Sequence, residues 1–177
     1  MAKSVLAASV LGAVLLAAPS GAATNPKTEA AKGPQQTTAE TREQGWRAQC
    51  TSASRDSKPN CAANKRVVLA NTGQLLAAIT IRVPPKTRKP VMMLHAPLGL
   101  YLPPGMSVAV GKEKPLTVPL QTCDNNGCYA GQPMPADLLE KFRKGEKLVL
   151  SFQDLSRQEI EVNISLKGFA EAYDKVK

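Results

Sequence analysis

Four cysteines are the residues of this 177-residue sequence whose spacing specifies chemistry most directly. Cys50 and Cys61 are separated by ten residues, and Cys123 and Cys128 by four. An even number of cysteines in an exported protein predicts disulfides, and four cysteines allow three pairings. An Asn-Gly step favours a tight turn between the second pair, and a polar stretch favours a loop between the first pair. We therefore expect local pairing first, with the two long-range pairings left open.

Two other uses of the cysteines fit the spacing less well. Structural zinc favours cysteines two to four residues apart, and the longer gap between Cys50 and Cys61 departs from that pattern. A redox-active dithiol is expected in a Cys-x-x-Cys motif, which the sequence lacks. We therefore expect four disulfide cysteines, no metal and no cofactor.

Candidate catalytic residues are few. His95, the single histidine, lies in an apolar run and is interpreted as a core or rim residue rather than a general base. Asp124, Asp137 and Glu140 offer carboxylates for glycoside chemistry, but nothing in the sequence selects a pair. The sequence has neither a Gly-x-Ser-x-Gly elbow nor a phosphate-binding glycine loop. We predict that the protein has no catalytic residue and is not an enzyme, and an enzyme using His95 is the third-ranked alternative.

The charge balance is basic, with 23 Lys and Arg against 14 Asp and Glu and a formal net charge of +9. Such a balance can indicate nucleic-acid binding, but the sequence has only one Trp, three Tyr and three Phe and no nucleic-acid-reading motif. We expect no nucleic-acid partner. The scattered basic residues indicate either an ordinary solvated surface or attraction to acidic lipid, lipopolysaccharide or another anionic partner. The expected partner is thus a protein or an anionic component of the envelope or of a host surface.

The N-terminus has the three-part layout of a secretory signal peptide. Lys3 supplies a basic start, an apolar stretch runs from Val5 to Ala18, and small residues follow. This stretch is shorter than the roughly 20 residues that a transmembrane helix needs, so the alternative of a membrane anchor fits less well. We expect residues 1–23 to be removed on export, after Ala22 or Ala23, leaving no transmembrane segment. The periplasm, the outer membrane and the medium are the expected destinations.

A polar segment follows, and the folded domain comes after it. Residues 24–44 contain no Val, Ile, Leu or aromatic residue, so they have little apolar area to bury on folding. We predict a flexible polar leader over 24–44 and one folded domain over 45–177.

The domain is predicted to be built mainly of strands. Alternating apolar and polar residues predict strands over 148–153 and 160–166, joined by a hairpin turn at Asp154–Arg157. Pro119 lies within an apolar run and indicates an edge strand, because proline donates no ladder hydrogen bond. Further strands are expected over 75–83, 91–96, 108–110 and 116–120.

Two short helices complete the prediction. Pro135 is placed for a first helical turn, Leu138 and Phe142 share one helix face, and Gly145 follows as a stop signal. Helical spacing of apolar residues predicts a second helix over 169–176. The expected fold class is all-β, an antiparallel β-sandwich with one or two short helices, held by disulfides.

Several segments occur in a recognisable order from about Trp46 to the C-terminus. They are Trp46–Cys50 (WRAQC), Cys61, Ile79–Val83 (ITIRV), Ala96–Gly105 (APLGLYLPPG), Cys123, Gly127–Ala130 (GCYA) and Val162–Phe169 (VNISLKGF). In this order they resemble the invasion-associated locus B family of bacterial exported proteins. The Pro-Leu-Gly…Leu-Pro-Pro-Gly segment, together with the Gly-Cys pair, is the more specific part. Read from its residues alone, Leu98–Gly105 is a strand and turn that shape the sandwich rather than a binding site.

The resemblance implies a small exported protein of alphaproteobacterial type, periplasmic or associated with the outer membrane. It supports a fold held by Cys50, Cys61, Cys123 and Cys128, and it supplies no catalytic residues. Pathogenic members of the family are linked to entry into host cells. We therefore expect a non-catalytic envelope protein that acts by binding and contributes to host-cell interaction or invasion. The alternative is a periplasmic housekeeping or stress protein that binds an anionic envelope component or a client.

Overall fold

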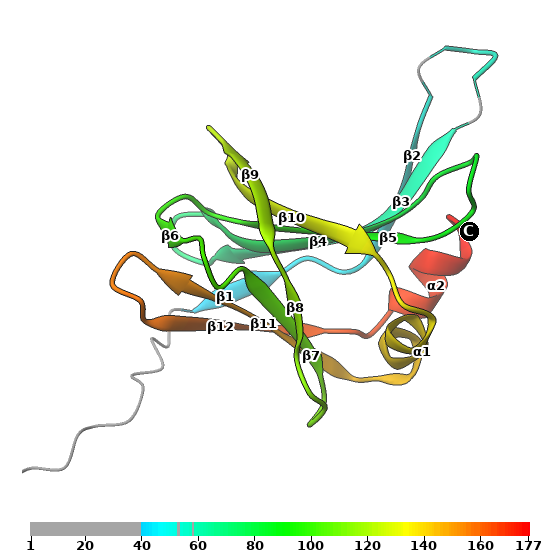
Figure 1. Cartoon of the computed structure of the whole chain (residues 1–177). Helices are drawn as coiled ribbons and strands as arrows, with labels where there is room; N and C mark the ends of the chain where they lie inside the picture. Colours follow the sequence, from blue (N-terminus) through cyan, green and yellow to red (C-terminus); the bar gives the residue numbers. More distant parts are fainter. Residues whose placement is uncertain (1–39, 53, 58) are drawn as a thin grey trace, which may run out of the picture. The chain divides into compact units, whose positions relative to one another are not determined.

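Two antiparallel sheets and two short helices make up the computed structural model, which describes residues 40–52, 54–57 and 59–177 (Figure 1). The sheets stack as a sandwich, so the expected fold class is confirmed. The predicted signal peptide over 1–23 and most of the predicted leader lie outside the described residues.

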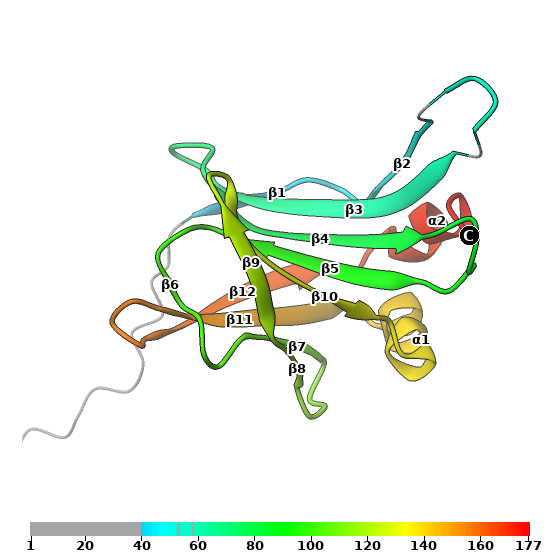
Figure 2. The same ribbon diagram turned by 45° about the horizontal axis from the view of Figure 1, so that its top comes forward.

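The larger sheet has seven strands in the order β1-β3-β4-β5-β10-β9, with β2 paired to the first half of β3. Figure 2 shows the antiparallel strands β3, β4 and β5 side by side, and the hairpin of β2 and β3 that extends beyond them. The strands are β1 (Thr41–Glu43), β2 (Arg47–Thr51), β3 (Asn60–Leu69), β4 (Leu75–Val83), β5 (Val91–Ala96), β9 (Leu120–Asp124) and β10 (Gly127–Pro133).

The smaller sheet has five strands in the order β12-β11-β7-β8, with β6 paired to β11. They are β6 (Leu100–Tyr101), β7 (Met106–Val110), β8 (Leu116–Val118), β11 (Lys147–Asp154) and β12 (Glu159–Ser165). Pro119 lies where the chain leaves β8 in this sheet and enters β9 in the other. Both are edge strands, which confirms the edge position expected for this proline.

The helices lie together at one end of the sandwich (Figure 1). Helix α1 (Ala136–Lys144) begins after Pro135 and ends before Gly145, and α2 spans Phe169–Asp174. Both predicted helices are confirmed, with α2 ending two residues earlier than expected. The ring of Phe169 packs edge-on against Phe142 at 5.3 Å and against Trp46 at 4.8 Å between ring centroids.

The core lies between the inner faces of the two sheets and under the helices. Alternate residues of β4, β5, β7, β11 and β12 point into it, as the alternating sequence pattern predicts. Its largest fully buried side chains include Phe142, Phe169, Ile79, Ile81, Met92, Leu94, Leu148, Leu150 and Ile164.

One expectation about the leader is wrong. Residues Thr41–Glu43 lie within the segment predicted to be flexible, yet they form β1 and pair with Val67–Leu69 of β3. No apolar pattern marks these residues, because β1 is held by ladder hydrogen bonds and by an ion pair between Glu43 and Lys65 rather than by apolar burial.

Candidate functional site

Both disulfides join neighbouring strands of the seven-stranded sheet. Cys50 pairs with Cys61 across β2 and β3, and Cys123 pairs with Cys128 across β9 and β10. This is the local pairing that the turn residues favoured. In the chain-entropy account, closing loops this short stabilises a fold by about 2–3 kcal/mol each. Each disulfide thus links the two strands of one hairpin, and both hairpins belong to the seven-stranded sheet.

The turn between β9 and β10 is centred on residues 125 and 126, one position earlier than the Asn-Gly step predicted. The Asp124 carboxylate accepts a hydrogen bond from the Asn126 N–H at 2.7 Å, which fixes this turn. Gly127 then begins β10 with a φ of +147°, and a Cβ there would collide with the Ala96 carbonyl and the His95 ring. Glycine is therefore required for close approach to β5 rather than for the turn itself.

His95 is held beside this hairpin on the outer face of the sheet. Its ring stacks on Tyr129 with centroids 4.4 Å apart, and its Nε2 lies 3.1 Å from the Asn126 carbonyl oxygen. The Tyr129 hydroxyl donates to Asp124 at 3.3 Å. The Asn126 backbone N–H lowers the pKa of Asp124, with a smaller contribution from Tyr129, and burial followed by the Asp124 charge raises the pKa of Tyr129.

The other two candidate carboxylates lie elsewhere, on α1. Asp137 lies 3.9 Å from Lys141 and Glu140 lies 3.2 Å from Lys144, each pair one helical turn apart. These contacts are exposed ion pairs of the kind that stabilise a helix surface slightly. Across residues 40–52, 54–57 and 59–177, no group of three His, Cys, Asp or Glu side chains is arranged to hold a metal ion. Within the same part of the chain, no helix has the length and apolar character needed to cross a membrane.

The sequence did not predict that four arginines gather on the outer face of the seven-stranded sheet. Buried residues of β3 alternate with the outward-facing residues 62, 64, 66 and 68. Each of these four residues is directly paired with residues on the neighbouring strands, and we call such a set of paired residues a cross-strand row. Side chains in one row point to the same face of the sheet. Every row holds one arginine: Arg82 opposite Ala62, Arg47 opposite Asn64, Arg66 opposite Ala78, and Arg42 opposite Val68. We call Arg42, Arg47, Arg66 and Arg82 the arginine ladder.

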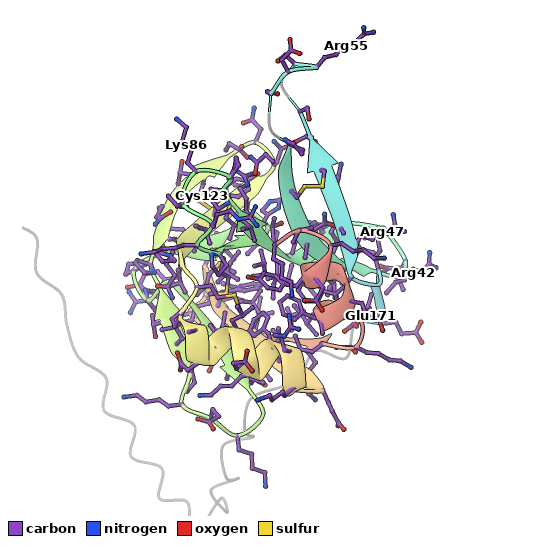
Figure 3. All side chains as sticks on the ribbon, turned by 90° about the vertical axis from the view of Figure 1, so that its right-hand side faces the viewer. Arg42, Arg47, Arg55, Lys86, Cys123 and Glu171 are labelled. Atoms are coloured by element: carbon purple, nitrogen blue, oxygen red, sulfur yellow. A yellow bond between two sulfur atoms is a disulfide. The ribbon has the colours of Figure 1, made fainter. Side chains whose placement is uncertain are left out.

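All four side chains of the arginine ladder are exposed. Figure 3 shows Arg42 and Arg47 projecting from the same side of the molecule. In the described part of the chain, the ion pairs involve other residues, and none of the four arginines has a carboxylate partner. Successive rows are about 7 Å apart along a strand, so the ladder covers about 20 Å. The arrangement presents four guanidinium groups that are available to an anionic partner.

The outer face of the five-stranded sheet differs in chemistry. Its cross-strand rows carry Glu161 opposite Ser151, and Ser151 opposite Ser107. The hydroxyls of Ser107 and Ser151 lie 2.6 Å apart, so each satisfies the other, and Ser151 is buried. This face is polar, small in side-chain size and partly acidic.

The sandwich is closed along one side by a polar junction. Lys65 is 4% exposed, and its Nζ lies 2.9 Å from Glu43 Oε2 and donates to the Ser165 carbonyl at 2.7 Å. The Trp46 indole N–H donates to the same carbonyl at 3.0 Å, and the Ser165 N–H donates to Glu43 at 3.3 Å. The junction therefore satisfies both backbone groups at the end of β12 with side chains from the opposite sheet.

The Leu98–Gly105 segment forms a bend, the short strand β6 and a turn at Pro103 and Pro104, so the predicted strand and turn are present. Leu100 is buried, and Leu98 and Leu102 are exposed on either side of it. At Gly105, φ is +73° and a Cβ would lie 2.6 Å from the Val118 carbonyl oxygen, so only glycine fits against β8.

This fold and these surfaces define a small β-sandwich with two braced hairpins and one basic outer face. The family model for the Invasion associated locus B (IalB) protein matches residues 46–177. The chain belongs to this family.

A solved structure is similar over most of the domain. It is described as the crystal structure of invasion associated protein B from Bartonella henselae, and it has a TM-score of 0.62 and 19% sequence identity to this chain. The match covers 74% of this chain and 89% of that chain. At this identity the likeness shows the fold alone. No curated protein sequence matches the chain.

Proposed function

We propose that this protein is exported to the cell envelope and acts there by binding an anionic partner through the outer face of its seven-stranded sheet. The arginine ladder carries this proposal, because four exposed guanidinium groups lie on one sheet without carboxylate partners among the described residues. Both disulfides brace the same sheet, which supports a preformed surface.

Export is supported by the disulfides and by the family. Disulfides persist in oxidising compartments and are rare in a reducing cytosol. Intact mass of the protein recovered from the envelope fraction, with thiols alkylated before and after reduction, tests this part. We expect a chain beginning at Ala23 or Thr24 whose cysteines react only after reduction. A full-length chain with four reactive thiols would contradict export.

Action by binding rather than by catalysis is supported by the state of the candidate catalytic groups. His95 is occupied by its stack on Tyr129 and its contact with the Asn126 carbonyl, and Asp137 and Glu140 each pair with a lysine. We expect His95→Ala to leave the cellular phenotype unchanged when compared with deletion of the protein. A phenotype equal to deletion, from a variant that folds normally, would point to histidine chemistry instead.

The binding surface itself is tested by cosedimentation with envelope fractions. The matched variants replace either Arg42, Arg47, Arg66 and Arg82 or four exposed lysines elsewhere, Lys112, Lys114, Lys147 and Lys167, with glutamine. Both sets remove the same charge, so a difference between them reports the surface rather than the net charge. We expect the ladder variant to lose envelope binding and the lysine variant to keep it. Equal behaviour of the two variants would contradict the proposal.

The family name connects this chain to invasion, and we propose that the bound partner lies where a host cell can be reached. Protease added to intact cells is expected to cut the protein if it is displayed at the surface. Protection until the outer membrane is opened would instead favour the alternative, a periplasmic housekeeping or stress protein that binds an anionic envelope component or a client.

A further inference from the structure

We infer that the ligand of the arginine ladder is a linear acidic polysaccharide lying along the outer face of the seven-stranded sheet. This inference rests on the proposed function, because it names the ligand class of the same surface. Four observations lead to it: the spacing of the arginines, the neutral side chains between them, the position of the exposed apolar residues, and the placement of the aromatic residues.

The spacing of the arginine ladder fits a chain of repeating charges. Each of four successive rows holds one arginine, and the rows follow one another at about 7 Å along the strands. A small anion would require several donors converging on one point. The four arginines lie one per row on β1, β2, β3 and β4, so the donors are spread over about 20 Å along the strands rather than gathered at one point. Donors spread in this way meet successive charges of an extended polymer.

The neutral side chains within the rows suit a hydroxyl-rich ligand. Asn64 and Thr80 share the row of Arg47, and Gln49 shares the row of Arg82. Their amide and hydroxyl groups both donate and accept hydrogen bonds, as sugar hydroxyls do. In the described strands β1 to β5, no outward-facing position of the rows holds a carboxylate that would repel an acidic chain.

The exposed apolar residues argue against a lipid bilayer as the ligand. Surface binding to anionic membranes combines apolar and basic side chains on one face. The large exposed apolar residues of the described chain are Leu98, Leu102 and Leu155. They flank β6 and occupy the β11–β12 turn of the five-stranded sheet, whereas the arginine ladder lies on strands of the seven-stranded sheet.

The aromatic residues argue against single-stranded nucleic acid. Sequence-tolerant binding of such strands relies on exposed rings on which bases stack. The described outward positions of β1 to β4 hold no aromatic residue, and His95 and Tyr129 of β5 and β10 already stack on each other. An acidic polysaccharide needs charge and hydrogen bonding from its receptor but no stacking platform.

The test uses the envelope-derived protein and two polymers with the same sugar backbone, dextran sulfate and uncharged dextran. We expect binding to dextran sulfate and none to dextran. The Arg42→Gln/Arg47→Gln/Arg66→Gln/Arg82→Gln variant is expected to lose about tenfold or more in affinity, with a shallower salt dependence. The matched variant at Lys112, Lys114, Lys147 and Lys167 is expected to change affinity by less than about threefold. Circular dichroism and thermal melts confirm that both variants keep the fold.

Two results would overturn the inference. One is an equal loss of affinity in the two variants, which would assign the binding to net charge. The other is tighter wild-type binding to phosphatidylglycerol vesicles or to oligothymidylate than to dextran sulfate. If the wild type ignores dextran sulfate but the ladder variant still loses envelope binding, the polysaccharide inference fails and the proposed function stands. If the ladder variant changes neither property, both fail.

Discussion

The two sheets of this sandwich share a core but present different chemistry to solvent. Residues 40–96 and 120–133, which form the seven-stranded sheet and its turns, contain ten Lys and Arg and four Asp and Glu. Residues 97–119 and 134–177, which form the five-stranded sheet and the helices, contain ten and nine. Both disulfides also belong to the seven-stranded sheet. The formal net charge of the chain is thus concentrated on the braced sheet, which a total over the whole sequence does not reveal.

The two sheets are also stabilised by different interactions. The seven-stranded sheet is held by two disulfides and by an ion pair at its edge between the buried Lys65 and the partly exposed Glu43, whereas the outer face of the five-stranded sheet has a contact between two neutral hydroxyls. Substitutions in each sheet should therefore differ in their effect on stability.

Removing the carboxylate of the polar junction is expected to have the largest effect on stability. Glu43→Ala leaves the Lys65 ammonium 4% exposed with the Ser165 carbonyl as its remaining partner. We expect a loss of about 3 kcal/mol in the free energy of unfolding, because an uncompensated buried charge is costly. Urea unfolding measures it, with Glu40→Ala as the exposed control expected to change stability by less than about 0.5 kcal/mol. Equal effects at the two positions would refute a role for the junction.

Removing a disulfide is expected to affect the seven-stranded sheet first. Cys50→Ala/Cys61→Ala is expected to lower the free energy of unfolding by about 2–3 kcal/mol through the freed loop. Amide hydrogen exchange is expected to rise in β2 and the first half of β3, with little change in β11 and β12. A uniform rise across both sheets would mean that the two unfold only as one unit.

The hydroxyl pair on the five-stranded sheet is expected to contribute less. Ser151→Ala leaves the Ser107 hydroxyl without its partner at 2.6 Å, and we expect a loss of about 1 kcal/mol. The double variant at Ser107 and Ser151 is expected to cost less than the sum of the two single variants, because neither hydroxyl is then left unpaired. Strict additivity in this double-mutant cycle would show that the two hydroxyls do not interact.

The smallest effect concerns the C-terminal helix and appears only in acid. Hydrogen bonds from Arg143 and then from Lys177 lower the pKa of Asp174 from 3.8 to about 2. A carboxyl with a lowered folded-state pKa adds stability above its unfolded value of 3.8, and this stability is lost as the pH falls toward 2. Thermal melts of wild type and Asp174→Asn are expected to differ near neutral pH and to converge near pH 2. A difference that is independent of pH would contradict this assignment.

Much of the fold was predictable from the sequence because many strands bury one face. Apolar and polar residues alternate in the second half of the run over 75–83 and in most of the run over 148–153, and each run forms a strand with buried apolar residues. By contrast, β1 and β2 are exposed along their whole length and have no apolar pattern to detect. Their pairing with β3 depends on backbone hydrogen bonds and a disulfide, which periodicity does not report.

The candidate surface was harder to predict than the fold. Alternation within β4 places Arg82 on a polar face, but the sequence does not say which strands neighbour it. Arg42 and Arg47 join the same face only because β1 and β2 both pair with β3. Arginines that are far apart in the sequence therefore share one face only because of the order and register of the strands.

The most direct test of the account is site-specific photo-crosslinking in living cells. A photoreactive phenylalanine analogue replaces either Asn64, within the arginine ladder rows, or Asn163, on the outer face of β12. We expect crosslinked envelope material from position 64 and little from position 163. Crosslinks from position 163 alone, or equally from both, would contradict the assignment of binding to the seven-stranded sheet.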